Sequence, residues 1–329
     1  MLQEKGEFAV YSDADIFGLT SKEDIMDEVV GEVEEFFRDK RKGQVVSPAR
    51  FTCEATDGRL VVTAGASEHK RLIGLRAYST FGEGGADPQV TVIYQMDGSL
   101  RGIFVGEEIG RIRTAAINAV AVKHLSRHDS TVLAVVGSGR QARSVVPYIA
   151  RVRQLERIYV SSLHPSHAKS YSESIGASLA GTGIDISVAE SAESAVSKAD
   201  IVLTATTSSS PVIRSAWVRS GQHISSMGHK FRESHEIEPD LVRDADIVAS
   251  DSVQQLKSYG PLFFVDEKSR ERIIDLAELI DGSGRSDEDV SLFLSVGLAG
   301  TEVVVAGKII SKLEDCQNGA ERNEMNTLG

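Results

Sequence analysis

An apolar run that ends in a glycine-rich turn lies between residues 132 and 142, and its pattern could serve nucleotide chemistry. The run 132–136 reads Val-Leu-Ala-Val-Val, and 137–142 reads Gly-Ser-Gly-Arg-Gln-Ala. Glycines at the first and third places allow a tight turn and close approach to a ligand, while the alanine lets a helix pack on the strand. The helix N-terminus can then hold a pyrophosphate. A second strand candidate at 157–161 has the spacing of a dinucleotide-binding unit, although an ordinary strand-to-helix turn is the alternative.

This pattern predicts binding of NAD(H) or NADP(H). The predicted contacts in the turn are Gly137, Ser138, Gly139, Arg140, Gln141 and Ala142.

Polar residues also follow two later strand candidates. Ligands of a doubly wound sheet lie beyond the carboxyl ends of its strands, so Thr206, Thr207 and Met227 are predicted to face the cofactor. The threonine hydroxyls could equally cap a polar loop. His229 would face the nicotinamide half, where a histidine can exchange a proton near neutral pH. A lone histidine is more often a surface or structural residue, and this alternative stays open.

The end of the second strand bears on the choice of cofactor. An NAD-selective domain normally has an acidic residue there, which binds the ribose hydroxyls and repels a 2′-phosphate. Here the sequence reads Val-Ser-Ser-Leu-His-Pro over 160–165, without an acid. Ser161 and Ser162 could donate to a phosphate. We therefore expect both cofactors to be accepted, with a modest preference for NADP(H).

Arginines recur in the first third of the chain, notably Arg50, Arg76, Arg111 and Arg113. The planar guanidinium matches the two oxygens of a carboxylate, although most arginines in proteins are solvated surface residues. Arg113 is the most interesting of the four because it precedes a helix candidate of small residues, whose N-terminus favours anions.

Composition excludes several classes of protein. A formal charge of −12 argues against nucleic acid as a partner, because phosphate binding needs a basic surface. We find neither a membrane-length apolar run nor a signal core at the N-terminus. The two cysteines, Cys53 and Cys316, lie far apart without a CxxC motif, so neither a disulfide framework nor a metal site is expected. These features predict a cytoplasmic protein without membrane contact.

The sequence divides into two regions with different patterns of predicted secondary structure, and these regions position the candidate residues. Residues 1–125 alternate helix and strand signals as an α+β region, and 126–297 alternate strands with helices as an α/β region. The first region contains strand candidates at 50–54, 59–63, 71–78, 89–94 and 100–105, and helices near 25–42 and 114–125. The second contains six at 132–136, 157–161, 185–188, 200–204, 222–227 and 246–249.

Six parallel strands are the number in a complete doubly wound dinucleotide domain. A late apolar helix at 303–310 has no strand left to serve there, so we expect it to return to the first region. The predicted organisation is one domain of 1–125 with 298–329 and a nucleotide-binding domain of 126–297.

Five segments together resemble the ornithine cyclodeaminase/μ-crystallin family in their order and spacing. They are residues 113–116, 137–142, 199–206, 221–228 and 293–299. The resemblance covers nearly the whole chain. It implies a homodimer in which a Rossmann domain is inserted in an α+β substrate-binding and dimerisation domain. It also implies hydride exchange with nicotinamide at the Cα–N bond of an amino acid or its imine.

Matching positions assign expected roles within this resemblance. Arg50 and Arg113 resemble the pair that holds the substrate carboxylate, and Thr114 resembles a residue that touches the cofactor phosphates. Ser295 and Gly297 would lie against the nicotinamide.

Two positions depart from the family pattern. Arg76 stands where the family usually has a catalytic lysine, and His229 stands where cyclodeaminases have an aspartate. Arginine stays protonated, so Arg76 could orient an imine or a carboxylate but is a poor base. His229 could donate the proton instead. A lysine that relatives carry within 293–295 and an arginine that many NADP-using relatives carry at Leu163 are also absent.

The leading hypothesis is an NAD(P)-dependent oxidoreductase that acts on the C–N bond of a small amino or imino acid, with Arg76 and His229 as catalytic residues. Two alternatives stay open. One is a cyclodeaminase of the ornithine type that recycles its bound NAD and releases ammonia. The other is a non-catalytic protein that binds NADP(H) or another small molecule, as μ-crystallin shows this fold can.

Overall fold

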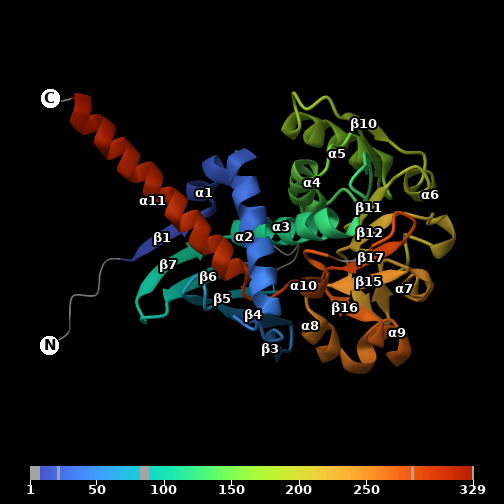
Figure 1. Cartoon of the computed structure of the whole chain (residues 1–329), viewed down its shortest axis with the longest axis horizontal. Coiled ribbons are helices and arrows are strands. Elements are labelled where there is room, and N and C mark those ends of the chain that lie inside the picture. The colour runs from blue at the N-terminus through green and yellow to red at the C-terminus, as the bar shows by residue number, and fades with distance from the viewer. Residues whose placement is uncertain (1–7, 21–22, 82–88, 283–284, 328–329) are drawn as a thin grey trace. The chain divides into compact units, whose positions relative to one another are not determined.

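A computed structural model describes residues 8–20, 23–81, 89–282 and 285–327. The chain forms two compact units, one of residues 1–113 with 299–329 and one of residues 114–298 (Figure 1). We call them unit 1 and unit 2. The division falls inside helix α3 (Glu108–Leu125), whereas the sequence placed the first boundary after residue 125. The reason lies in packing, because the guanidinium of Arg153 in unit 2 donates to the carbonyls of Val122 and Lys123 at the end of α3.

Unit 1 is built on one sheet of seven strands in the order β1-β7-β6-β5-β4-β2, with β3 paired to β4. The strands are β1 (Ala9–Ser12), β2 (Val45–Val46), β3 (Phe51–Ala55), β4 (Gly58–Ser67), β5 (Leu72–Ser79), β6 (Gln89–Gln95) and β7 (Leu100–Val105). β1 pairs with β7 in parallel, and the remaining pairs are antiparallel. The five predicted strands are all present, with ends shifted by a few residues in most of them.

Helices α2 (Glu23–Arg41) and α11 (Thr301–Thr327) pack together, and α11 lies on the sheet of unit 1 (Figure 1). A shorter helix, α1 (Asp13–Thr20), follows β1. The chain enters α11 through Gly300, whose φ of 93° favours glycine. A Cβ atom on Gly65 would lie 2.5 Å from the Cα atom of Gly300. Two glycines therefore let the start of α11 lie against β4.

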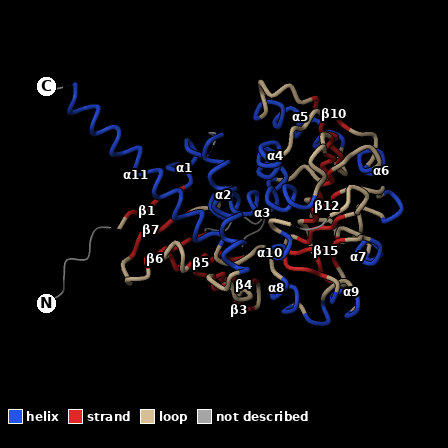
Figure 2. Tube along the Cα trace, in the orientation of Figure 1, coloured by secondary structure: helices blue, strands red, loops and turns tan. Residues whose placement is uncertain are grey.

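Unit 2 contains a parallel sheet of eight strands in the order β10-β9-β8-β11-β12-β17-β15-β16 (Figure 2). The strands are β8 (Val132–Val136), β9 (Arg157–Ser161), β10 (Asp185–Val188), β11 (Ile201–Thr204), β12 (His223–Ser226), β15 (Ile247–Ser250), β16 (Ile273–Asp275) and β17 (Ser291–Leu294). This is a Rossmann-type doubly wound α/β fold, as the sequence predicted.

The number of strands corrects one expectation. The sequence predicted six, and the sheet also contains β16 and β17, with β17 inserted between β12 and β15. All four residues of β17 are fully buried, and such a short apolar run has no periodicity that separates a strand from a buried loop. Its pairing with β12 joins residues almost seventy positions apart, from His223 with Ser291 to Ser226 with Leu294.

Helices connect the strands of unit 2. They are α4 (Arg140–Val152), α5 (Pro165–Ser178), α6 (Ala192–Val196), α7 (Pro239–Asp244), α8 (Val253–Ser258), α9 (Glu267–Glu271) and α10 (Leu276–Leu279). A small hairpin of β13 (Lys230–Phe231) and β14 (Ser234–His235) follows β12. Among the described residues, no helix combines the length and apolar character that crossing a bilayer requires.

Candidate functional site

The glycine turn follows β8 and leads directly into α4. Gly137 has a φ of 110°, and a Cβ atom there would lie 2.4 Å from the carbonyl oxygen of Ala205, so the position requires glycine. Gly139, Arg140 and Gln141 are exposed, whereas Ala142, in the first turn of α4, is fully buried. The first turn of α4 contains no acidic residue. The turn can therefore present N–H groups and a helix N-terminus to a pyrophosphate, which is the geometry that a dinucleotide needs.

The end of β9 lies beside this turn. The hydroxyls of Ser138 and Ser162 are 2.9 Å apart, which joins the glycine turn to the residue after β9. Ser161 is buried, and Leu163 is 90% exposed. The rings of His164 and His167 pack edge to face at the start of α5, with centroids 5.1 Å apart. The structure thus brings polar and basic groups, without an acidic side chain in 160–165, to the expected ribose end of the site.

The loops after β11 and β12 meet at a residue that the sequence analysis missed. The backbone N–H and the hydroxyl of Thr206 both donate to Glu236 at 3.0 Å. The Thr206 hydroxyl is therefore engaged within the protein, which favours the loop-capping alternative for that side chain. Thr207 is exposed and Met227 is half-buried. Glu236 lies just after β14, where no periodic pattern marks it.

His229 is exposed on the loop after β12. Its Nδ1 lies 2.7 Å from the hydroxyl of Ser234, which belongs to β14. This contact orients the ring and leaves Nε2 as the nitrogen that can exchange a proton with a ligand.

The loop after β17 is held by two further side chains. Asp251 accepts the N–H groups of Val296 and Gly297 at 2.8 Å and 2.7 Å. Asn118 of α3 donates to the hydroxyl of Ser295 at 3.3 Å and to the carbonyl of Thr114 at 2.9 Å. The structure therefore brings Thr114 and Ser295 together.

The sequence does contain weak signals for these two side chains. Asp251 comes soon after the predicted strand at 246–249, and Asn118 is a polar residue in a helix of small apolar ones.

Unit 1 contains a group of guanidinium side chains that we call the arginine cluster, made of Arg50, Arg76 and Arg113. Arg76 lies on β5 and Arg113 on α3, and their exposed fractions are only 8% and 9%. Arg50 is half-buried just before β3. A Cβ atom on Gly110 would lie 2.7 Å from Nη2 of Arg76, so this glycine lets the guanidinium lie against α3 one turn before Arg113.

Contacts within β5 and β6 fix the orientation of Arg76. Its Nε donates to Oε1 of Gln89 at 3.1 Å, and its guanidinium carbon lies 4.5 Å from the ring centre of Tyr78. Burial and the positive charge of Arg113 lower the pKa of Arg76 to about 10, and the nearby Glu302 opposes that shift.

Among the buried polar atoms that make no hydrogen bond within the described part of the chain are one nitrogen of this cluster and one oxygen of a carboxylate near it. They are Nε of Arg113 and Oε1 of Glu302, a fully buried residue in the first turn of α11. Buried polar atoms are normally paired, because an unpaired one loses its hydration without compensation. Three guanidinium groups against one carboxylate leave an excess of positive charge. A carboxylate ligand would compensate that charge with bidentate hydrogen bonds.

Comparison with known proteins identifies the family of this chain. The family profile described as "Ornithine cyclodeaminase/mu-crystallin family" matches residues 15–317. The chain belongs to this family. The resemblance in the five sequence segments is thereby confirmed.

Curated members of the family include named reductases. A Delta(1)-pyrroline-2-carboxylate reductase of Bacillus cereus is 32% identical over 210 residues, which cover 61% of this chain and 63% of that protein. The ketimine reductase mu-crystallin of Mus musculus is 27% identical over 215 residues, 65% of each chain. The aligned part spans between 45% and 65% of the length of the first curated relatives.

Solved structures match over almost the whole chain. The Delta(1)-pyrroline-2-carboxylate reductase of Thermococcus litoralis, in complex with NADH and L-proline, has a TM-score of 0.82 and 26% identity, and covers 94% of this chain and 98% of that one. A probable ornithine cyclodeaminase from Bordetella pertussis has a TM-score of 0.84 and 23% identity, and covers 95% and 99%. The second match shows a shared fold.

Proposed function

We propose that this protein is an NAD(P)-dependent reductase of the C=N bond in a small 2-imino acid. The observation that supports the proposal most is the arginine cluster, in which Arg113 is buried with an Nε that finds no hydrogen-bond partner among the residues the structure describes. Such a group fits a ligand carboxylate, and the same chain has a glycine turn with dinucleotide geometry. The names of the reductases similar to this chain support the same activity.

Different residues of the chain would bind the substrate carboxylate and supply the proton. Bound nicotinamide would supply a hydride to the imine carbon. Arg50 and Arg113 hold the carboxylate, and Arg76, fixed by Gln89 and Tyr78, stabilises the anion from a third direction. His229 donates the proton that the nitrogen gains as the imine becomes an amine.

The cofactor contacts stay proposals drawn from position in the fold. Residues 137–142 hold the pyrophosphate, and Ser161 and Ser162 contact the ribose or its phosphate. Thr114, Ser295 and Gly297 lie toward the phosphates and the nicotinamide.

The test is oxidation of NADPH or NADH with Δ1-pyrroline-2-carboxylate, Δ1-piperideine-2-carboxylate, and pyruvate with ammonia. We expect stoichiometric oxidation with at least one of the three. If none of them drives oxidation, the reductase proposal is wrong. Release of ammonia from ornithine with only catalytic NAD would indicate a cyclodeaminase instead. Tight NADPH binding without turnover of any amino or imino acid would indicate a binding protein.

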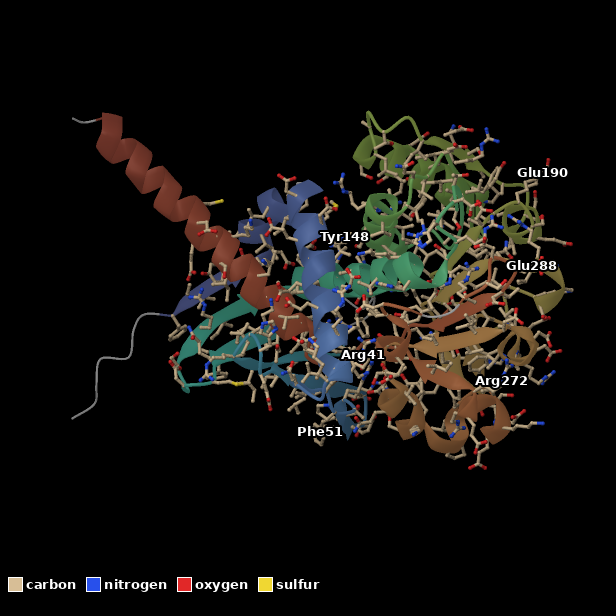
Figure 3. The ribbon with its side chains drawn as sticks, in the orientation of Figure 1. Arg41, Phe51, Tyr148, Glu190, Arg272 and Glu288 are labelled. Atoms are coloured by element: carbon tan, nitrogen blue, oxygen red, sulfur yellow. The ribbon has the colours of Figure 1, made fainter. Side chains whose placement is uncertain are left out.

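We also propose that the protein is a homodimer that pairs the open face of the unit 1 sheet. Strand residues on the face opposite α11 expose apolar side chains. The exposed fractions are 60% for Val10, 65% for Phe51, 47% for Ile73, 39% for Tyr94 and 47% for Val105. Phe51 is labelled in Figure 3. Contiguous apolar surface of this kind favours burial against a second copy. Size-exclusion chromatography with light scattering tests this directly.

A further inference from the structure

Glu236 gathers more hydrogen bonds than a carboxylate needs for a structural contact alone. It is fully buried in unit 2 and accepts from groups on two different loops. The hydroxyl of Thr204 at the end of β11 donates at 2.6 Å, and the hydroxyl of Ser226 at the end of β12 donates at 2.9 Å. Thr206 donates twice at 3.0 Å, and the N–H of Gly228 donates as well.

These donors belong to the segments that carry the proposed cofactor contacts. Thr206 lies in the loop after β11, and Gly228 lies between Met227 and His229 in the loop after β12. A Cβ atom on Gly228 would come within 2.4 Å of the Glu236 carboxylate, so only glycine lets the loop approach this closely. The carbonyl of the same residue is held by Lys230, whose Nζ donates to it at 2.8 Å.

The network continues to the glycine turn after β8. The position that a Cβ atom would take on Gly137 lies 2.4 Å from the carbonyl oxygen of Ala205 and 3.0 Å from Cγ2 of Thr206. Residues 205–206 therefore form the wall against which the turn folds, and Glu236 fixes that wall through both polar groups of Thr206. One carboxylate thus determines the relative placement of the loops after β8, β11 and β12.

We propose that Glu236 is a positioning residue for the nicotinamide cofactor. This inference rests on the proposed function. Its carboxylate accepts every one of these contacts, and a carboxamide cannot, because its NH₂ group would face N–H and O–H donors. Loss of the carboxylate would let the loops after β11 and β12 separate and would misplace the glycine turn. Glu236 itself is buried beneath these loops and acts through them.

The experiment compares Glu236→Gln with Glu238→Gln by fluorescence titration of NADPH. Glu238 is a matched control because it lies two residues further along the same segment and, among the described residues, accepts the N–H of Ser215 alone, at 2.9 Å. We expect the Kd for NADPH to rise by about tenfold or more in Glu236→Gln and to stay within about twofold in Glu238→Gln. The KM for the imino acid should change little.

A merely structural role would lower Tm and leave the Kd of the folded protein unchanged. A folded Glu236→Gln variant that binds NADPH within about threefold of the wild type would overturn the proposal. If Glu236→Gln does not fold, the Kd for NADPH of Thr204→Val tests the proposal instead. Thr204 is fully buried, and its hydroxyl donates to Glu236. A raised Kd in Thr204→Val supports the proposal, and an unchanged Kd overturns it. Wild-type protein that binds neither cofactor would overturn the proposed function as well.

Discussion

Replacing Arg113 by methionine removes one guanidinium from the arginine cluster and keeps most of the apolar stem. If Arg113 holds the substrate carboxylate, the variant loses a charge-assisted, bidentate contact in a buried site. Such a contact contributes about 2 to 4 kcal/mol, so kcat/KM should fall by roughly 30- to 800-fold. The Kd for NADPH should stay close to the wild-type value.

The same substitution should not destabilise the free protein. Nε of Arg113 makes no hydrogen bond within the described residues, and its charge adds to the effect of burial in lowering the pKa of Arg76 to about 10. A cation whose pKa is lowered on folding destabilises the folded state below that pKa, and the penalty fades as the pH rises from about 10 toward the ordinary pKa of arginine. Removing Arg113 relieves part of this penalty at neutral pH. We therefore expect the Tm of Arg113→Met to equal or exceed that of the wild type.

The assay measures kcat/KM with Δ1-pyrroline-2-carboxylate and Tm by differential scanning calorimetry. Arg111→Met is a matched control, because Arg111 lies on the same helix, is half-buried and pairs with Glu108 at 3.0 Å. The control should keep kcat/KM within about threefold of the wild type. A folded Arg113→Met variant with nearly normal kcat/KM would refute the carboxylate role. A large loss of Tm would show that the guanidinium is structural.

The other predictions address the proton donor, the cofactor, the dimer and the end of α3. His229→Ala should keep NADPH binding and lose kcat, and a folded variant with the wild-type kcat removes His229 from the mechanism. At one salt concentration kcat/KM should modestly favour NADPH, and a preference for NADH beyond about tenfold, or roughly 1.4 kcal/mol, would contradict this. Ile73→Asp should give monomers in light scattering, and persistent dimers would exclude the open sheet face as the interface. Arg153→Met should lower the free energy of unfolding in urea by about 2 to 4 kcal/mol, since it removes the hydrogen bonds from the buried guanidinium to the carbonyls of Val122, Lys123 and Ser126, and an unchanged midpoint would refute that role.

Local patterns in the sequence predicted much of the fold. The strand at 132–136, the glycine turn and the strand at 157–161 appear at the expected residues, because each depends on neighbours within about twenty positions. Arg76 and Arg113 were predicted as site residues, and both are buried in one cluster. The fold class follows from the alternation of strands and helices, and it is confirmed.

Contacts between distant residues could not be predicted in the same way. Glu236 meets Thr204 across 32 positions, and Asp251 meets Val296 across 45. Each is an ordinary acidic residue in the sequence, and only the sheet brings its donors together. β17 was missed for the same reason, since its place between β12 and β15 depends on pairing over long separations. Hydroxyl chemistry at Thr206 was recognised, but its partner was not.

The buried acidic residues named above differ in whether the fold itself pairs their oxygens. Glu236 and Asp251 in unit 2 accept backbone N–H groups, so their charges are compensated within the fold and they hold loops in place. Arg113 and Glu302 in unit 1 have atoms without hydrogen bonds among the described residues. An unpaired buried polar atom costs about 1 to 3 kcal/mol, and at Arg113 the excess positive charge of the cluster favours a carboxylate ligand as the missing partner. These contacts support the two proposals together, in which the compensated carboxylates position loops and the arginine cluster binds the substrate carboxylate.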